Sequence, residues 1–180
     1  MVNPDYREAP VTSEGKEEPK NNENNEQEPL IIKSGAFRAG AEIPAKYTCD
    51  AGDVSPEISW ENVPEGTKTL ALIVDDPDAP DGTWVHWVVW NIPVTARNLS
   101  EGISESALAS LGAILGKNDF DQLKYGGPCP PSGTHRYFFK LSALNTELNL
   151  VEGSTKAELL NGINGHVLGE AELVANYSTK

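Results

Sequence analysis

From Leu30 onward the chain alternates short apolar runs with breaks of Pro, Gly and Asp, which recur roughly every 8 to 15 residues. This spacing is typical of an antiparallel all-β domain, because each run supplies one strand and each break supplies a turn. Some runs are apolar on both faces, which favours two packed sheets over a single solvated sheet. We therefore predict a mainly β fold, a two-sheet antiparallel β-sandwich. The clearest predicted strands are Leu70–Val74, Trp84–Asn91, Arg136–Leu144 and Val167–Val174.

Two segments depart from the strand pattern and predict short helices. Glu105–Leu115 has a weak helical pattern. Thr155-Lys-Ala-Glu158 is a capping box that opens a second helix, which Gly162 to Gly165 would end. We expect one or two short helices at the periphery of the sandwich.

Residues 1–29 are rich in Glu, Asn and Pro and include the run NNENNEQEP. Such a composition cannot bury enough apolar surface to offset its ordering entropy, so it predicts a disordered, acidic and Asn-rich tail. Residues 30–180 form the single predicted domain. The tail fits either a solvated leader on a cytoplasmic protein or a tether on an exported or lipid-anchored one, and composition does not choose between them.

The chain carries 14 basic and 27 acidic residues among 180, a formal charge of −13. This charge repels nucleic acid and anionic membrane surfaces, so a nucleic-acid role is not expected. No run approaches the roughly 20 apolar residues of a transmembrane helix. An acidic protein binds an anion only through local donors, so an anion site here should be small and enclosed.

Two predicted strands carry histidines among aromatic residues. In Trp84-Val-His-Trp-Val-Val-Trp90, regular alternation places Trp84, His86, Val88 and Trp90 on one face, with Val85, Trp87 and Val89 on the other. In Thr134-His-Arg-Tyr-Phe-Phe139, it places His135, Tyr137 and Phe139 together, opposite Arg136 and Phe138. A lone histidine on an apolar face is more often a core residue than a ligand. A second histidine and a phenol on one face favour a site.

Two loops adjoin these strands. The segment Asp75-Asp-Pro-Asp-Ala-Pro80 ends the predicted strand Leu70–Val74, because proline cannot continue a ladder and aspartate favours turns. Its position before the His86 strand makes Asp76 and Asp78 candidate ligand residues. The run 125–133, Tyr-Gly-Gly-Pro-Cys-Pro-Pro-Ser-Gly, is rigid and extended, and fits either a pocket wall or a surface turn.

The two cysteines, Cys49 and Cys129, lie 80 positions apart and form no CxxC motif. One disulfide and two free thiols are both consistent with this separation.

Taken together, these segments resemble the phosphatidylethanolamine-binding protein family, in its bacterial and archaeal branch related to Raf kinase inhibitor protein. The resemblance spans roughly Ile32 to Tyr177. The motifs that carry it are Lys46-Tyr-Thr-Cys-Asp50, Val54-Ser-Pro56, Ile58-Ser-Trp60, Asp76-Pro-Asp-Ala-Pro80, Trp84-Val-His86, Gly116-Lys-Asn-Asp-Phe120, Gly127-Pro-Cys-Pro-Pro131, His135-Arg-Tyr137 and Gly165-His-Val-Leu168.

The resemblance implies a sandwich of a large and a small antiparallel sheet with an anion pocket near one end. It implies that the pocket binds phosphate or a phospholipid head group such as phosphorylethanolamine. It also favours a short distance between Cys49 and Cys129, and by analogy a homodimer. The implied ligand-binding residues are Asp76, Asp78, Pro80, Trp84, His86, Cys129, Pro130, Pro131, His135 and Tyr137.

The polar residues of this set suit an oxyanion. Imidazole and phenol groups donate to phosphate oxygens, while Asp76 can orient a histidine or hold it charged by raising its pKa. Non-catalytic anion binding that weakens as the histidines deprotonate is therefore the leading prediction. We expect neither a cofactor nor a metal.

Two alternatives remain from the sequence. In the first, the chain inhibits a serine protease or a kinase through a protein surface, as relatives of the family do. In the second, it is a hydrolase with Ser132 or Ser55 as nucleophile, or a metal enzyme using His86, His135 and either Cys129 or Asp76. The absence of a G-x-S-x-G elbow and of an HExxH helix speaks against the second alternative.

Overall fold

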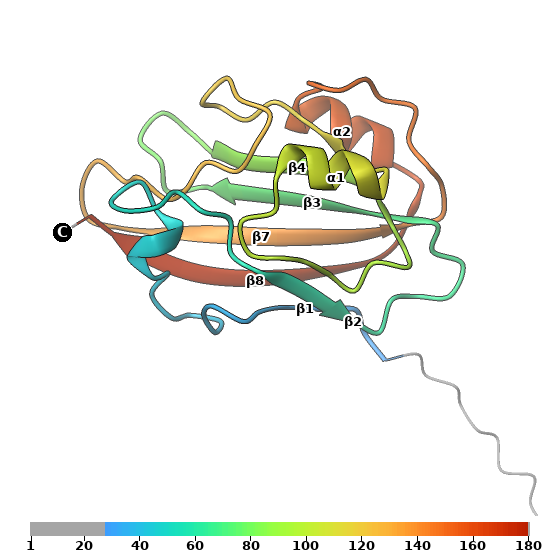
Figure 1. Cartoon of the computed structure of the whole chain (residues 1–180), viewed down its shortest axis with the longest axis horizontal. Coiled ribbons are helices and arrows are strands. Elements are labelled where there is room, and N and C mark those ends of the chain that lie inside the picture. Colours follow the sequence, from blue (N-terminus) through green and yellow to red (C-terminus); the bar gives the residue numbers. More distant parts are fainter. Residues whose placement is uncertain (1–27, 180) are drawn as a thin grey trace, which may run out of the picture.

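The computed structural model describes residues 28–179. The predicted tail therefore lies almost entirely outside the described residues. The described part of the chain folds as two facing antiparallel sheets with two short α-helices at the periphery (Figure 1). This confirms the predicted mainly β sandwich.

The small sheet has the order β1-β2-β5, formed by Ile31–Ser34, Ile58–Glu61 and Asn98–Leu99. The large sheet has the order β6-β4-β3-β7-β8. Its strands are β3 (Thr69–Asp76), β4 (Trp84–Pro93), β6 (Ile114–Leu115), β7 (Thr134–Leu144) and β8 (Val167–Ser178).

The four strands predicted as clearest correspond to β3, β4, β7 and β8. The observed strands begin or end up to four residues beyond the predicted limits, and β8 continues to Ser178 instead of stopping at Val174. The short strands β1, β2, β5 and β6 have only two to four residues each. Such short strands carry too little alternation to stand out in the sequence.

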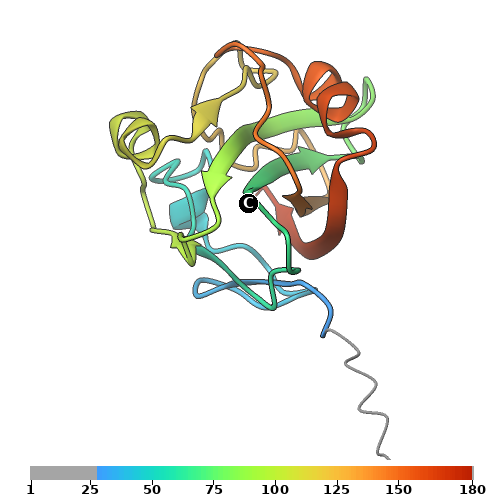
Figure 2. The ribbon, with the colours of Figure 1, turned by 90° about the vertical axis from the view of Figure 1, so that its right-hand side faces the viewer.

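The main core lies between the two sheets. Ile58 and Trp60 of the small sheet pack there with Leu72, Trp87 and Phe139 of the large sheet. A second core on the outer face of the large sheet includes Leu159 and Ile163 of the helix α2 (Lys156–Ile163), and Figure 2 shows this helix in orange-red over the sheet. The central strand β3 is consequently buried along its whole length.

The two α-helices begin at hydroxyl caps. In α1 (Glu105–Leu111) the Ser104 side chain accepts a hydrogen bond from the Ala107 amide, and Gly112, with φ of 89°, ends the helix. The helix is therefore shorter than the predicted Glu105–Leu115. The predicted capping box of Thr155 and Glu158 is present and opens α2 (Lys156–Ile163). A 3₁₀ turn, η1, spans Ala45–Tyr47.

A buried carboxylate connects α2 to the sheet. Asp75, at the end of β3, is fully buried. Its oxygens lie 2.9 Å from Lys140 Nζ on β7 and 2.5 Å from Lys156 Nζ in the first turn of α2. Two ammonium groups compensate this buried charge, so the contact fixes α2 over the outer face of β3. Asp75 thus has a structural partner, while the next residue, Asp76, faces a cavity.

Candidate functional site

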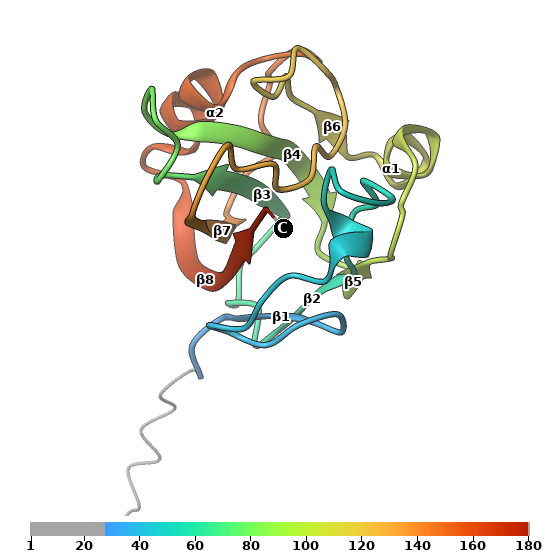
Figure 3. The same ribbon diagram turned by 90° about the vertical axis from the view of Figure 1, so that its left-hand side faces the viewer.

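A cavity of about 320 Å³ lies at the end of the large sheet where β3 ends and β4 and β7 begin. Figure 3 views the molecule from this end of the sheet. Its walls are mostly apolar, with two histidines and two aspartates among them. The lining residues are Asp76, Ala79, Pro80, Asp81, Trp84, His86, Phe120, Cys129, Pro130, Pro131 and His135. Candidate residues from two loops and two strands of the sequence therefore meet around one cavity.

Asp76 and His135 form a buried pair in the cavity wall. Asp76 Oδ2 lies 2.7 Å from His135 Nδ1, and the two side chains are only 4% and 9% exposed. Asp76 Oδ1 accepts a hydrogen bond of 2.8 Å from the Asp78 amide. Because Nδ1 donates to the carboxylate, the free nitrogen of His135 is Nε2, which makes no hydrogen bond to any residue in 28–179.

His86 reaches the cavity because β4 is irregular at this point. Val74 pairs with Trp87 and the next residue, Asp75, pairs with Val85, so His86 is an extra residue in the ladder. The bulge corrects the predicted faces: Val85 packs in the outer core with Val88 and Trp90, not with Trp87. Regular alternation fails here because a bulge shifts every later side chain to the opposite face.

The ring of His86 contacts Phe120 and Tyr137, with ring centroids 5.4 and 5.2 Å away. Its Nδ1 lies 2.7 Å from the Gly126 carbonyl oxygen. Burial lowers the pKa of His86 below its usual 6.5, although the Gly126 carbonyl and the Asp76 charge oppose the shift. The neutral imidazole is thus favoured in the unliganded protein.

Tyr137 lies beside the cavity, although it is not among the residues that line it. Its hydroxyl is buried, and no residue in 28–179 forms a hydrogen bond of normal geometry with it, although the Asp76 carboxylate and the Cys129 amide lie near enough to act on its pKa. Burial raises the pKa of Tyr137, and the negative charge of Asp76 raises it further, while the Cys129 amide opposes the shift. Tyr137 therefore keeps its proton and provides a donor close to Asp76 and Cys129.

The loop 126–131 forms the opposite wall and is held by the segment 47–53. Cys49 and Cys129 are joined by a disulfide, which decides the pairing that the sequence left open. The Cys49 amide donates to the Pro128 carbonyl, and the Gly127 amide donates to Asp53 Oδ1. A Cβ at Gly127 would lie 2.6 Å from the Tyr47 carbonyl oxygen, so this close approach requires glycine.

Asp78 has a different role from the predicted one. It does not line the cavity, and its carboxylate instead forms a two-pronged ion pair with Arg136, at 2.8 Å to Nε and 2.7 Å to Nη2. The Arg136 guanidinium lowers the pKa of Asp78 to about 2. The pair links the loop after β3 to the start of β7, so Asp78 supports the wall without facing a ligand.

Three lining residues were not predicted: Ala79, Asp81 and Phe120. Phe120 packs edge-on against both Trp84 and His86. Phe120 ends the family motif Gly116-Lys-Asn-Asp-Phe120, and this motif was the one feature of the sequence that could have placed it at the site. Its position beside Trp84 and His86 of β4, more than 30 residues away in the sequence, depends on tertiary folding.

Of the enzyme alternatives, the metal enzyme has its residues at this cavity, because His86, His135, Cys129 and Asp76 all line it, whereas the hydrolase does not. Neither Ser55 nor Ser132 is among its lining residues. Among the described residues no group of three or more His, Cys, Asp or Glu could hold a metal ion. His166, the residue before β8, lies with its Nδ1 2.9 Å from Asn145 Oδ1.

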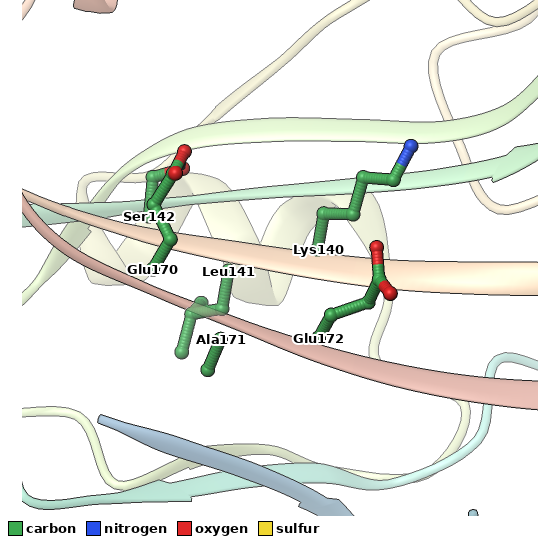
Figure 4. A pocket seen from close by; sticks show the side chains of 6 residues that line it. All are labelled: Lys140, Leu141, Ser142, Glu170, Ala171 and Glu172. Carbon is green, nitrogen blue, oxygen red and sulfur yellow. Dashed lines mark hydrogen bonds between the residues drawn. The ribbon is translucent and has the colours of Figure 1, made fainter. Parts of the chain in front are cut away.

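A second hollow of about 320 Å³ lies on the outer face of β7 and β8 (Figure 4). Lys140, Ser142, Glu170 and Glu172 rise from one side of the two strands, whereas Leu141 and Ala171 point to the other. Lys140 already pairs with Asp75, and the Ser142 hydroxyl lies 3.4 Å from a Glu170 oxygen. This hollow therefore lacks the buried, unpaired polar groups of the first cavity.

A family model described as phosphatidylethanolamine-binding protein matches residues 33–178. The chain belongs to this family. Among curated proteins it is 49% identical over 148 residues to the UPF0098 protein of Methanothermobacter thermautotrophicus, covering 82% of this chain and 98% of that one. It is also 49% identical over 151 residues to the UPF0098 protein of Aquifex aeolicus, covering 82% and 88%.

Two solved structures share the phosphatidylethanolamine-binding protein fold. A homologue of the family from Chlamydia trachomatis superposes with a TM-score of 0.78 at 39% identity, covering 84% of this chain and 99% of that one. YbcL of E. coli, described as a member of the mammalian family, superposes with a TM-score of 0.77 at 35% identity and the same coverage. These matches confirm the resemblance seen in the sequence. No helix within residues 28–179 is long and apolar enough to cross a membrane.

Proposed function

We propose that the cavity binds a small oxyanion, a phosphate or a phosphorylated head group, and does not transform it. The observation that carries this proposal is a set of three polar groups with no protein partner in residues 28–179. They are Nε2 of His135, Nε2 of His86 and the buried hydroxyl of Tyr137. The buried hydroxyl of Tyr137 is without a partner, which is unusual in a native protein, and the two histidine nitrogens converge on the same cavity, so the three groups together indicate a ligand.

The chemistry of the three groups fits phosphate. Tyr137 donates through its hydroxyl, and His135 donates through Nε2 when it is protonated. The Asp76 carboxylate, 2.7 Å from Nδ1, then balances the charge of the His135 ring. The apolar walls formed by Pro80, Trp84 and Phe120 keep water from competing for these donors. Local donors in a small cavity are what an anion site requires in a chain with a formal charge of −13.

The family adds the class of ligand. The model that matches residues 33–178 is named for phosphatidylethanolamine binding, so a phosphorylated ethanolamine head group is the first candidate. Binding without turnover is the simpler proposal, because no serine is among the described residues that line the cavity.

Trp84 provides a direct measurement of this binding. Trp84 is 38% exposed and lines the cavity, whereas Trp60, Trp87 and Trp90 are buried. Phosphorylethanolamine is expected to shield the Trp84 indole from quenching by acrylamide, with saturation at one ligand per chain. A Trp84→Phe variant is the control, because it should remove the shielding signal while the ligand still binds in calorimetry.

The same titration tests the role of the histidines. The affinity is expected to fall as the pH rises from about 5 to about 8, because an anion binds better to protonated imidazole. The pKa of His86 in the unliganded protein lies below 6.5, so its proton is gained only toward the acid end of this range. An affinity that stays flat across the range, or no shielding of Trp84 at any pH, would contradict the proposal.

A further inference from the structure

The hydrogen bond between His86 and Gly126 determines what His86 can offer a ligand. A carbonyl oxygen only accepts, so Nδ1, 2.7 Å from the Gly126 oxygen, must carry the ring proton. In the neutral ring the other nitrogen, Nε2, then has a lone pair and no proton. His86 therefore presents an acceptor, and not a donor, to a ligand in the cavity that it lines.

The loop around Gly126 holds this arrangement in place. The Gly127 amide donates to Asp53 Oδ1, and the Gly126 amide donates to the His86 carbonyl. The disulfide at Cys129 fixes the same loop three residues further on. The Gly126 carbonyl cannot turn away without breaking these contacts, so the tautomer of His86 is set by the backbone.

The surroundings of His86 also favour its neutral form. The ring is 2% exposed and packs against the rings of Phe120 and Tyr137. Burial lowers the pKa of His86, and the nearby charges of Asp76 and Asp119 only oppose that shift in part. His135 is the other basic group at the cavity, and its Nδ1 already donates to Asp76.

A phosphate oxygen without a proton would face the lone pair of His86 Nε2, which is repulsive. A phosphate O–H would instead donate to it, while the remaining oxygens accept from His135 and Tyr137. A phosphate monoester carries such a proton in its monoanion, because its second pKa is about 6. A phosphate diester, as in an intact phospholipid, and sulfate carry none near neutral pH.

We infer that His86 makes the cavity selective for a phosphoryl group that carries a proton, so that it takes phosphate monoesters in preference to the diester of an intact phospholipid. The inference rests on the proposed function and specifies its ligand. Asp76 and Asp81 in the wall add to the preference for a singly charged anion over a dianion. A free head group such as phosphorylethanolamine, or inorganic phosphate, is then the fitting ligand.

Calorimetry with four probes at about pH 6, where about half of a phosphate monoester is the protonated monoanion, tests this selectivity. Phosphorylethanolamine and glycerophosphorylethanolamine share the head group and differ as monoester and diester, while inorganic phosphate and sulfate are matched in size. The monoester and phosphate are expected to bind about tenfold or more tightly than the diester and sulfate, because an unpaired acceptor facing an oxygen lone pair costs that much affinity.

Two substitutions at His86 separate its role as a hydrogen-bond acceptor from its role in packing. In His86→Asn the amide nitrogen can still donate to Gly126 in place of Nδ1, but no group replaces Nε2, so monoester affinity should fall toward that of the diester. In His86→Gln the amide reaches the position of Nε2 and can donate or accept, so sulfate and diester should bind as well as phosphate. Thermal unfolding of both variants shows whether they fold.

The outcomes are distinct. If the wild-type protein binds the diester as tightly as the monoester, or sulfate as tightly as phosphate, the inferred selectivity is wrong while the proposed anion site stands. If none of the four probes binds, both the selectivity and the proposed function are wrong. The comparison within the wild-type protein needs no variant, so it decides the question even if His86 cannot be replaced.

Discussion

Replacing His135 with leucine is expected to lower the free energy of unfolding by about 3 kcal/mol and to abolish phosphate binding. The leucine removes the partner 2.7 Å from Asp76 Oδ2 and leaves a carboxylate that is only 4% exposed with one unpaired oxygen. Removing the hydrogen-bond partner of a buried carboxylate costs more than the bond itself contributes, because the remaining charge is uncompensated. Urea unfolding and calorimetric titration with phosphorylethanolamine measure the two effects.

The matched control is His135→Asn. Its amide nitrogen can donate to Asp76 in place of Nδ1, but it offers nothing at the position of Nε2. This variant should therefore keep most of the stability while its phosphate affinity falls on the order of tenfold to a hundredfold. Should His135→Asn bind phosphate like the wild-type protein, His135 would be a purely structural residue and the proposed donor would be wrong.

Loss of the disulfide is expected to have the largest effect on stability. Cys49 and Cys129 close a loop with a sequence separation of 80 residues. The chain-entropy estimate for a loop of that length is a loss of about 4 kcal/mol when the bond is removed, provided that the unfolded chain is otherwise unchanged. Urea unfolding of a Cys49→Ser, Cys129→Ser double variant at neutral pH measures the loss.

Reduction with dithiothreitol supplies an internal control. The chain has only these two cysteines, so reduction should destabilise the wild-type protein and leave the double variant unchanged. Affinity for phosphorylethanolamine should also fall in the variant, because Cys129, Pro130 and Pro131 form one wall of the cavity. A urea midpoint that does not move on reduction would show that the contacts at Asp53 and Pro128 alone hold the loop.

Much of the site follows from local pattern. Period-two alternation placed His135 and Tyr137 on one face of their strand, and both approach Asp76 and His86 as the motifs implied. The capping box at Thr155 also formed as predicted, because such a motif depends only on residues three positions apart. These features are fixed by the short-range geometry of strands and helices.

The parts that could not be predicted depend on how distant segments meet. The bulge at His86 arises from the pairing of β4 with β3, and alternation within β4 alone cannot reveal it. Asp78 and Arg136 are 58 residues apart, and only the folded sheet shows that they pair. The contact of Phe120 with Trp84 is likewise tertiary. The sequence therefore predicts which polar residues gather at the cavity better than it predicts their individual contacts.

The pairing of Asp76 with His135 gives the central claim a definite geometry. If the cavity is a phosphoryl site, the bound group must lie between the free nitrogens of the two histidines, within reach of Tyr137. A crystal structure of the protein grown with phosphorylethanolamine tests this directly. We expect the phosphoryl oxygens within hydrogen-bond distance, about 3 Å, of His135 Nε2 and His86 Nε2. A phosphoryl group bound elsewhere, for example in the hollow on β7 and β8, with this cavity holding only water, would contradict the account.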